Sequence, residues 1–439
     1  MSFFVVKPLS RIKGIVDLPG DKSIAHRAII LSAIAKGKTL VKNFPLNKDC
    51  LSTIEAIRKL GVRIIKKEKD FVVSGKGLSG LTKPKSPIFI EESGTTFRLF
   101  LGLLAGQSFQ TTLIAGKSLS NRPMLRVNAP LRLMGAKICA NEKKQAGKPE
   151  DYPPIVINGG KLKPIEYSLP VASAQVKSAL LLAALYAKGE TKIIEPVNTR
   201  DHTERMLKMF KADIETQGSV ISLKGGRELE SPNEVFCPGD ISSASFFIVA
   251  SIVLPDSEIL IKNVCLNPSR LGVINVLKRM GVDIEINELR GEEFEPIGDL
   301  LAKSSNLKST IIKKEEIPTL IDELPVLMVA ASFAKGKSVF EGVEELRVKE
   351  TDRIQSMCDG LKKMGVDIFV VKSASREDVV INGGNKLKGN EVRSFGDHRT
   401  AMSLIIAGLA ADGETRIDDV SCIDKSFPDF LKILKNITK

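Results

Sequence analysis

Residues 20–43 read GDKSIAHRAIILSAIAKGKTLVKN, and this stretch contains the features of a structural repeat. A polar start at Gly20-Asp21-Lys22-Ser23 leads into an apolar run, which is typical of a buried helix. Gly37 then predicts a turn, and the stretch 38–42 has the composition of a strand. The stretch therefore predicts a helix, a short turn and a strand.

The same order of features returns along the chain, so that six copies can be recognised. The later copies begin with SGTTFRLFLGLLAG at Ser93, SAQVKSALLLAA at Ser173, GDISSASFFIVAS at Gly239, DELPVLMVAAS at Asp322 and GDHRTAMSLIIAGLA at Gly396. A second helix with one apolar face follows each copy, as in residues 272–280. We therefore predict an α/β protein of six strand-helix-strand-helix-strand repeats, with the first helix of each repeat buried and the second half-exposed.

Composition limits the class of protein. The chain has 439 residues, with 65 Lys and Arg against 52 Asp and Glu, a net charge of +13. Its length corresponds to two to four ordinary domains, and its basic surplus favours anionic partners. Aromatic residues are only 5% and Trp is absent, which argues against a protein that stacks single-stranded bases. The scattered cysteines, without a CxxC pair, and the short apolar runs predict a soluble cytoplasmic protein.

Several cations stand in the first turns of the expected first helices, where they oppose the helix dipole unless an anion lies nearby. These residues are Lys22, Arg27, His398 and Arg399. Helix N-termini with Lys and Arg form anion sites. Surface charges are the simpler interpretation of any one residue, but most of these occupy equivalent places in the repeat.

Two acids accompany these cations. Asp322 precedes an apolar run where an N-cap is the simpler interpretation, and Glu350 stands in ELRVKETDR, where an ordinary ion pair is the simpler one. Acids among many cations also suit proton transfer beside a phosphorylated substrate. The three histidines have no metal-ligand spacing. The residues alone predict a transferase or isomerase of small phosphorylated anions.

Nine segments together resemble the 3-phosphoshikimate 1-carboxyvinyltransferase (EPSP synthase) family. They are PGDKSIAHRA, SGTTFRL, LSNRPM, SAQVKSALLLAA, TRDHTERML, PGDISSASFF, LRVKETDRI, GDHRTAM and SFPDF. The resemblance implies a two-domain inside-out α/β barrel with three repeats per domain. One domain would comprise residues 1–20 and 238–439 and the other residues 21–237, with the active site in the cleft between them.

The family transfers the enolpyruvyl group of phosphoenolpyruvate to the 5-hydroxyl of shikimate 3-phosphate, releasing phosphate in chorismate biosynthesis. The resemblance implies no cofactor, no metal, no nucleic acid and no membrane partner. It also implies a cytoplasmic monomer that is sensitive to glyphosate, the family's donor-site inhibitor.

Residues that match the family's motifs have implied roles. Asp322 would be the base toward the 5-hydroxyl, Glu350 the acid toward the methylene carbon, and Lys22 a further catalytic residue; His398 would assist. Shikimate 3-phosphate would be bound by Lys22, Ser23, Arg27, Ser173, Ala174, Gln175, Arg200, Asp322 and Lys349. Phosphoenolpyruvate would be bound by Lys22, Gly94, Arg122, Gln175, Arg353, Arg399 and Lys425.

One segment departs from the family's pattern, since Glu91-Glu92 stands where the family usually has Gly-Asn. A carboxylate roughly 6 Å from the donor anion would weaken donor binding by repulsion. Alternatively, Glu92 points away and pairs with a surface cation.

Two other functions remain open at this point. UDP-N-acetylglucosamine enolpyruvyl transferases share the fold and the donor, but they usually carry a reactive Cys in the loop matching KSLSNRP, which has none here. A non-catalytic basic repeat protein that binds nucleic acid would instead tolerate changes at Asp322 and Glu350 and would show steep salt dependence.

Overall fold

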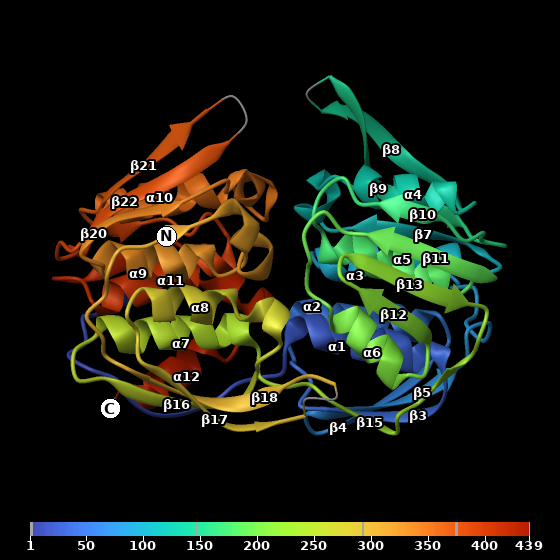
Figure 1. The fold of residues 1–439 in the computed structure, drawn as a ribbon, viewed down its shortest axis with the longest axis horizontal. Helices are drawn as coiled ribbons and strands as arrows, with labels where there is room; N and C mark the ends of the chain where they lie inside the picture. The colour runs from blue at the N-terminus through green and yellow to red at the C-terminus, as the bar shows by residue number, and fades with distance from the viewer. Residues whose placement is uncertain (1–2, 146, 292–293, 374–375, 439) are drawn as a thin grey trace. The chain divides into compact units, whose positions relative to one another are not determined.

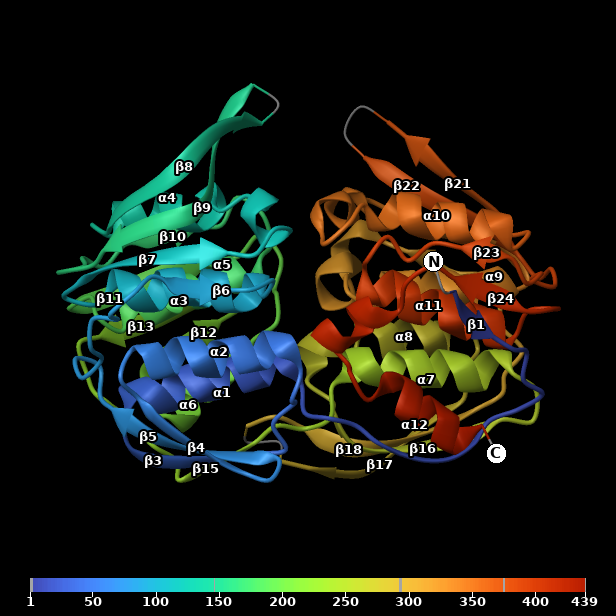
Figure 2. The ribbon, with the colours of Figure 1, turned by 180° about the vertical axis from the view of Figure 1, so that it is seen from behind.

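The computed structural model describes residues 3–145, 147–291, 294–373 and 376–438. The chain forms two compact units: unit 1 comprises Met1–Pro19 and Pro238–Lys439, and unit 2 comprises Gly20–Cys237 (Figures 1 and 2). Gly20 belongs to unit 2, where it packs so closely that an added Cβ would lie 2.2 Å from the carbonyl oxygen of Asn43.

Three apolar helices form the core of unit 2, because they are apolar on nearly every face. They are α1 (Lys22–Ile34), α3 (Gly94–Ala105) and α5 (Ala174–Ala184). Helix α3 packs against both of the others. The three second helices have polar outer faces and cover this core; they are α2 (Lys48–Lys59), α4 (Leu125–Leu133) and α6 (His202–Met209).

Three sheets enclose the helices of unit 2, and each repeats one topology. In neighbour order they are β14 (Leu229–Glu230), β3 (Ala35–Lys42), β5 (Asp70–Lys76) and β4 (Arg63–Lys67), with β15 (Glu234–Phe236) also on β3; β6 (Ile88–Ile90), β7 (Gln110–Ala115), β9 (Lys148–Asn158) and β8 (Lys137–Gln145); and β10 (Glu166–Ser168), β11 (Gly189–Ile194), β13 (Val220–Gly225) and β12 (Asp213–Gln217). The parallel edge strand of each sheet comes from another repeat, which links the repeats into one unit.

Unit 1 has the same plan. Its core helices α7 (Ile241–Val253), α9 (Leu324–Phe333) and α11 (His398–Leu409) all pack against one another. Its outer helices are α8 (Gly272–Arg279), α10 (Arg353–Lys363) and α12 (Phe430–Ile437). The apolar face predicted for residues 272–280 is confirmed, since Val273, Val276 and Leu277 are fully buried.

The sheets of unit 1 use strands from both ends of the chain. They are β2 (Lys13–Asp17), β16 (Glu258–Cys265), β18 (Ile297–Lys303) and β17 (Ile284–Arg290); β19 (Ile311–Ile312), β20 (Gly336–Phe340), β22 (Glu377–Gly383) and β21 (Asp367–Lys372); and β1 (Phe4–Val6), β24 (Thr415–Ile417) and β23 (Glu391–Val392). In the last sheet, β1 takes the place of the strand that the sixth repeat lacks, and it pairs antiparallel with β24 (Figure 2).

Short 3-10 helices join these elements. They are η1 (Leu119–Asn121), η2 (Pro268–Arg270), η3 (Lys314–Thr319), η4 (Glu344–Val348) and η5 (Ser421–Lys425). The turn expected at Gly37 is wrong in detail, because β3 begins at Ala35 directly after α1 and Gly37 lies inside the strand with a φ of 102°. Within the described ranges, no helix is both long enough and apolar enough to span a membrane.

Candidate active site

Five of the six core helices begin with the side-chain cap that the repeat predicts. The caps are Asp21 on Ile24 N, Ser93 on Thr96 N, Ser173 on Val176 N, Asp240 on Ser242 N, and Asp397 on both Arg399 N and Thr400 N. Each cap satisfies a backbone N–H that the helix leaves without an acceptor. These Ser and Asp side chains are therefore accounted for by helix geometry.

Helix α9 is the exception. Its N-cap position is Glu323, and no side chain of the described residues caps it. Asp322 precedes that position, so its carboxylate does not act as the expected N-cap. The carboxylate lies 3.6 Å from Nη1 of Arg353 and 3.9 Å from Nε of Arg399, with 23% of the side chain exposed. Asp322 thus presents a partly exposed carboxylate among cations.

Arg353 is the centre of a carboxylate cluster in unit 1. Its side chain is 2% exposed, its Nε donates to Asp397 at 2.9 Å, and its Nη2 pairs with Glu350. Burial alone lowers the pKa of this guanidinium, but Asp397, Glu350 and Asp322 outweigh burial and raise it. The ion pair considered for Glu350 is therefore present. It also places Glu350 and Asp322 around one fixed cation.

Arg399 links the start of α11 to the start of α9. Its Nη1 donates to the carbonyl oxygen of Asp322 at 2.7 Å. Beside it, the fully buried Glu323 lies 3.9 Å from Arg399 and 3.7 Å from the buried Arg270. This polar network fixes the backbone that carries Asp322.

The remaining predicted residues of unit 1 lie at the ends of neighbouring elements. Lys349 follows η4, and its Nζ is 3.9 Å from Glu345. His398 is buried at the first position of α11. Lys425 ends η5 and is half-buried. The contacts of the described residues tie Asp322, Glu350, Arg353 and Arg399 into one cluster.

In unit 2, Lys22 occupies the first turn of α1, where a cation is unfavourable by itself. Asp49 of α2 compensates it, with 2.9 Å between Nζ of Lys22 and Oδ2 of Asp49. Sequence reasoning expected an anion at this point but did not identify Asp49. The available signal was its place in the first turn of the second helix.

Arg27 is held rigidly. Its Nε donates to Thr203 at 2.6 Å, its Nη2 to Ser178 at 2.7 Å, and its Nη1 to the carbonyl oxygen of Ser23 at 2.8 Å. The side chain is buried. These bonds join α1, α5 and α6, so Arg27 positions three elements around the start of α1.

Two further contacts connect the predicted donor residues of unit 2. A Cβ added to Gly94 would lie 2.8 Å from Nη1 of Arg122, so the guanidinium of Arg122 rests on the start of α3. Gln175 of α5 accepts from Arg98 at 2.7 Å and donates to Thr95 at 2.8 Å, which fixes the orientation of its amide. Arg98 had no predicted role, although it fixes the amide of Gln175.

Ser173, Ala174 and Arg200 complete the predicted set in unit 2. Ser173 caps α5, Ala174 is the first residue of that helix, and Arg200 precedes α6. Arg200 belongs to the loop 195–201, whose base is held by the buried ion pair between Lys177 and Glu195 at 2.8 Å. These positions place all three residues at starts of helices.

Glu92 makes two hydrogen bonds that neither expectation for it included. Its carboxylate accepts hydrogen bonds from Ser118 N at 3.2 Å and Leu119 N at 2.8 Å. The alternative in which Glu92 pairs with a surface cation is wrong, because the described residues place no cation within ion-pair distance of it. The carboxylate instead contacts the loop that leads to Arg122.

His26 lies at the centre of unit 2, where its Nδ1 is 2.7 Å from Oγ1 of Thr53. Thr53 is in turn 2.6 Å from Oγ1 of Thr96, which donates to the α3 cap Ser93 at 2.8 Å. Burial lowers the pKa of His26 from 6.5 to about 3, although Asp49 opposes the shift. The imidazole is therefore neutral, and through Thr53 and Thr96 it links α1 and α2 to the start of α3.

We expect His26→Asn to remove part of the acid sensitivity of the fold. The unfolded chain takes up a proton near pH 6.5, whereas the folded chain does so only near pH 3. Stability from the neutral imidazole is therefore present above pH 6.5 and is lost as pH falls. Between pH 7 and pH 5 the free energy of unfolding should fall by about 2 kcal/mol more in the parent than in His26→Asn. Urea unfolding at the two pH values measures this, and equal decreases would contradict a neutral His26.

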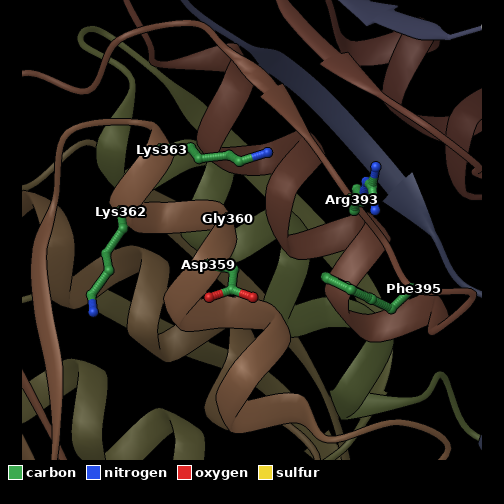
Figure 3. Close-up of a pocket in the computed structure, with 6 residues that line it drawn as sticks. All are labelled: Asp359, Gly360, Lys362, Lys363, Arg393 and Phe395. Carbon is green, nitrogen blue, oxygen red and sulfur yellow. The ribbon is translucent and has the colours of Figure 1, made fainter.

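A separate cavity of about 340 Å³ lies on unit 1 (Figure 3). It is lined by Asp359, Gly360, Lys362, Lys363, Arg393 and Phe395. Figure 3 shows Lys362 pointing away from Lys363 and Arg393, and Lys363 donates to the carbonyl oxygen of Glu391 at 3.3 Å. The cations do not converge on one point, and none of the predicted site residues lines this cavity.

The comparisons with known proteins agree with one another. The family model described as EPSP synthase (3-phosphoshikimate 1-carboxyvinyltransferase) matches residues 6–434. Proteins named 3-phosphoshikimate 1-carboxyvinyltransferase from Bacillus cytotoxicus and Geotalea daltonii are 47% and 46% identical to this chain. The first alignment covers 97% of this chain and 98% of the relative, and the second covers 100% of both.

Solved structures show the same relationship. The EPSP synthase of Acinetobacter baumannii is 42% identical with a TM-score of 0.86, covering 99% of this chain and 98% of that one. The enolpyruvyl transferase NikO of Streptomyces tendae covers 99% and 97% at a TM-score of 0.74, but at 17% identity it supports the fold alone. The predicted two-domain α/β enolpyruvyl transferase fold is thus confirmed, and the chain belongs to the EPSP synthase family, the 3-phosphoshikimate 1-carboxyvinyltransferases.

Proposed function

We propose that this chain transfers the enolpyruvyl group of phosphoenolpyruvate to the 5-hydroxyl of shikimate 3-phosphate and releases phosphate. The observation that carries the proposal is the position of Asp322. This residue precedes the N-cap of α9, and its carboxylate lies beside Arg353 and Arg399. A carboxylate that is 23% exposed can accept a proton from a substrate hydroxyl.

The proposed chemistry uses two acids. Asp322 takes the proton of the 5-hydroxyl while the hydroxyl oxygen attacks C2 of phosphoenolpyruvate. Glu350 protonates C3 of phosphoenolpyruvate, which becomes a methyl group. The tetrahedral adduct then loses phosphate while a proton leaves that methyl group, which restores the double bond. Arg353 contacts both acids, so it fixes their positions relative to each other.

The proposed binding residues supply the positive charge that two anionic substrates require. The full proposed set for shikimate 3-phosphate is Lys22, Ser23, Arg27, Ser173, Ala174, Gln175, Arg200, Asp322 and Lys349, and that for phosphoenolpyruvate is Lys22, Gly94, Arg122, Gln175, Arg353, Arg399 and Lys425. The positive charge comes from the Lys and Arg side chains in these sets. Planar guanidinium groups can bind carboxylate and phosphate through paired hydrogen bonds. His398 is proposed to assist.

Membership of the family favours the shikimate acceptor over UDP-N-acetylglucosamine. Phosphate release should require both phosphoenolpyruvate and shikimate 3-phosphate, with no release when either is omitted. UDP-N-acetylglucosamine should not replace the acceptor. Release with the sugar nucleotide and none with the shikimate compound would reverse the assignment of the acceptor.

We further propose that the protein acts as a cytoplasmic monomer on small molecules, without nucleic acid. All six cysteines are free thiols, which suits a reducing compartment. Sedimentation equilibrium should give a mass near 47.8 kDa at micromolar concentration, and twice that mass would contradict the monomer.

A further inference from the structure

Backbone hydrogen bonds hold the loop between β7 and Arg122, both within the loop and to the segment before α3. Gly116 N donates to the carbonyl oxygens of Ile90 at 3.1 Å and Glu91 at 2.6 Å, which ties the loop to the segment before α3. Within the loop, Ser120 N donates to Gly116 O at 2.9 Å and Arg122 N to Leu119 O at 3.0 Å. The N–H groups that begin η1 have no acceptor inside the loop, since a helix start cannot satisfy them.

Glu92 supplies both missing acceptors. Its Oε1 accepts from Ser118 N at 3.2 Å and its Oε2 from Leu119 N at 2.8 Å. Leu119 is fully buried, so its N–H would have no ready replacement from solvent. A carboxylate suits this place because both of its oxygens accept, whereas an amide offers one acceptor and one donor.

The same loop carries Arg122 to the start of α3. Glu92 stands two residues before Gly94, and the guanidinium of Arg122 would lie 2.8 Å from a Cβ on Gly94. A shift of the loop relative to Glu92 therefore moves Arg122 relative to Gly94. Gly94 has no side chain that could hold Arg122 in place, so the position of the guanidinium depends on the loop.

We propose that Glu92 is a positioning residue for Arg122: its carboxylate fixes the η1 loop through Ser118 and Leu119 and so sets where the guanidinium meets the donor. The inference rests on the proposed function for its effect on catalysis. If Glu92 positions Arg122, removal of its carboxylate weakens donor binding. If Glu92 instead repelled the donor, removal of the carboxylate would strengthen donor binding.

The matched pair Glu92→Gln and Glu91→Gln tests this. Both variants remove one negative charge, but the side chain of Glu91 is exposed and makes no hydrogen bond or ion pair among the described residues, whereas that of Glu92 makes two hydrogen bonds. Glu92→Gln should raise the phosphoenolpyruvate KM about 10-fold and leave the shikimate 3-phosphate KM within about 2-fold. Glu91→Gln should leave both constants unchanged. Equal effects from the two variants, or a lower donor KM in Glu92→Gln, would overturn the proposal.

Two further measurements separate positioning from a general loss of structure. If Glu92 acts through Arg122, then Glu92→Gln added to Arg122→Ala should change the donor KM no further, because coupled residues are not additive. Amide hydrogen exchange of the peptide spanning 116–122 should be faster in Glu92→Gln and unchanged in Glu91→Gln.

The exchange result does not depend on activity. If the parent protein released no phosphate, the proposed function would fail, yet exchange would still decide whether Glu92 holds the loop. Unchanged exchange in Glu92→Gln, or full additivity with Arg122→Ala, would contradict the positioning role.

Discussion

Asp322→Ala and Glu350→Gln are each expected to lower kcat by about 10²–10⁴-fold, the usual contribution of a general acid or base. KM should change much less, because neither acid is proposed to act mainly in binding. Asp322 contacts Arg353 and Arg399, and the N-cap position of α9 is Glu323, which neither variant changes. Initial rates of phosphate release at saturating substrates measure the effect.

A carboxylate outside the cluster provides the control. Glu344 lies on η4 near Glu350 but pairs with Lys314 at 3.3 Å. Glu344→Gln should keep kcat within about 2-fold, since exposed pairs of this kind contribute little. Near-normal kcat in both Asp322→Ala and Glu350→Gln would show that proton transfer is done by other groups.

Lys177→Met is expected to produce the largest loss of stability. The ammonium of Lys177 is 1% exposed and lies 2.8 Å from Glu195 and 2.6 Å from Glu204, which are also buried. Removing it leaves two buried carboxylates without their cation, which should lower the free energy of unfolding by about 3–5 kcal/mol. Urea unfolding at pH 7 measures this, with Lys192→Met as the control, because Lys192 and its partner Glu190 are exposed.

The loss should be smaller at acid pH. Burial raises the pKa of Glu204, and Lys177 opposes that rise. Without Lys177 the pKa should rise further, so that the folded variant binds a proton more readily than the unfolded chain. Its stability should therefore recover as pH falls from 7 to 5. A loss below about 1 kcal/mol at pH 7, or one that grows on acidification, would contradict the buried ion network.

Much of the fold can be predicted because each repeat has the same local sequence pattern. The polar starts Asp21, Ser93 and Ser173 and the apolar runs after them predict core helices, and the structure confirms their caps. Strand pairing is different, since β1 and β2 join sheets made by residues far along the chain. No local pattern specifies those partners, and only the family resemblance suggested that the N-terminal segment joins the C-terminal half.

In the candidate site, too, local features could be predicted from the sequence and long-range contacts could not. Cations at helix starts, such as Lys22 and Arg399, could be recognised because they oppose the helix dipole. Their partners could not, because the distance from Lys22 to Asp49 is set by the packing of α1 against α2. Glu92 illustrates the limit most clearly: its charge suggested repulsion, whereas the fold turns both oxygens toward backbone N–H groups.

The most direct test of the proposed transfer identifies the product instead of the phosphate. Phosphoenolpyruvate labelled with ¹³C at C2, incubated with shikimate 3-phosphate and the protein, should give a vinyl ether carbon whose NMR signal shows a three-bond coupling through oxygen to the proton at position 5 of the shikimate ring. One phosphate should appear for each vinyl ether formed. Labelled pyruvate accompanying the phosphate, with no vinyl ether, would mean that the protein hydrolyses the donor and would contradict enolpyruvyl transfer.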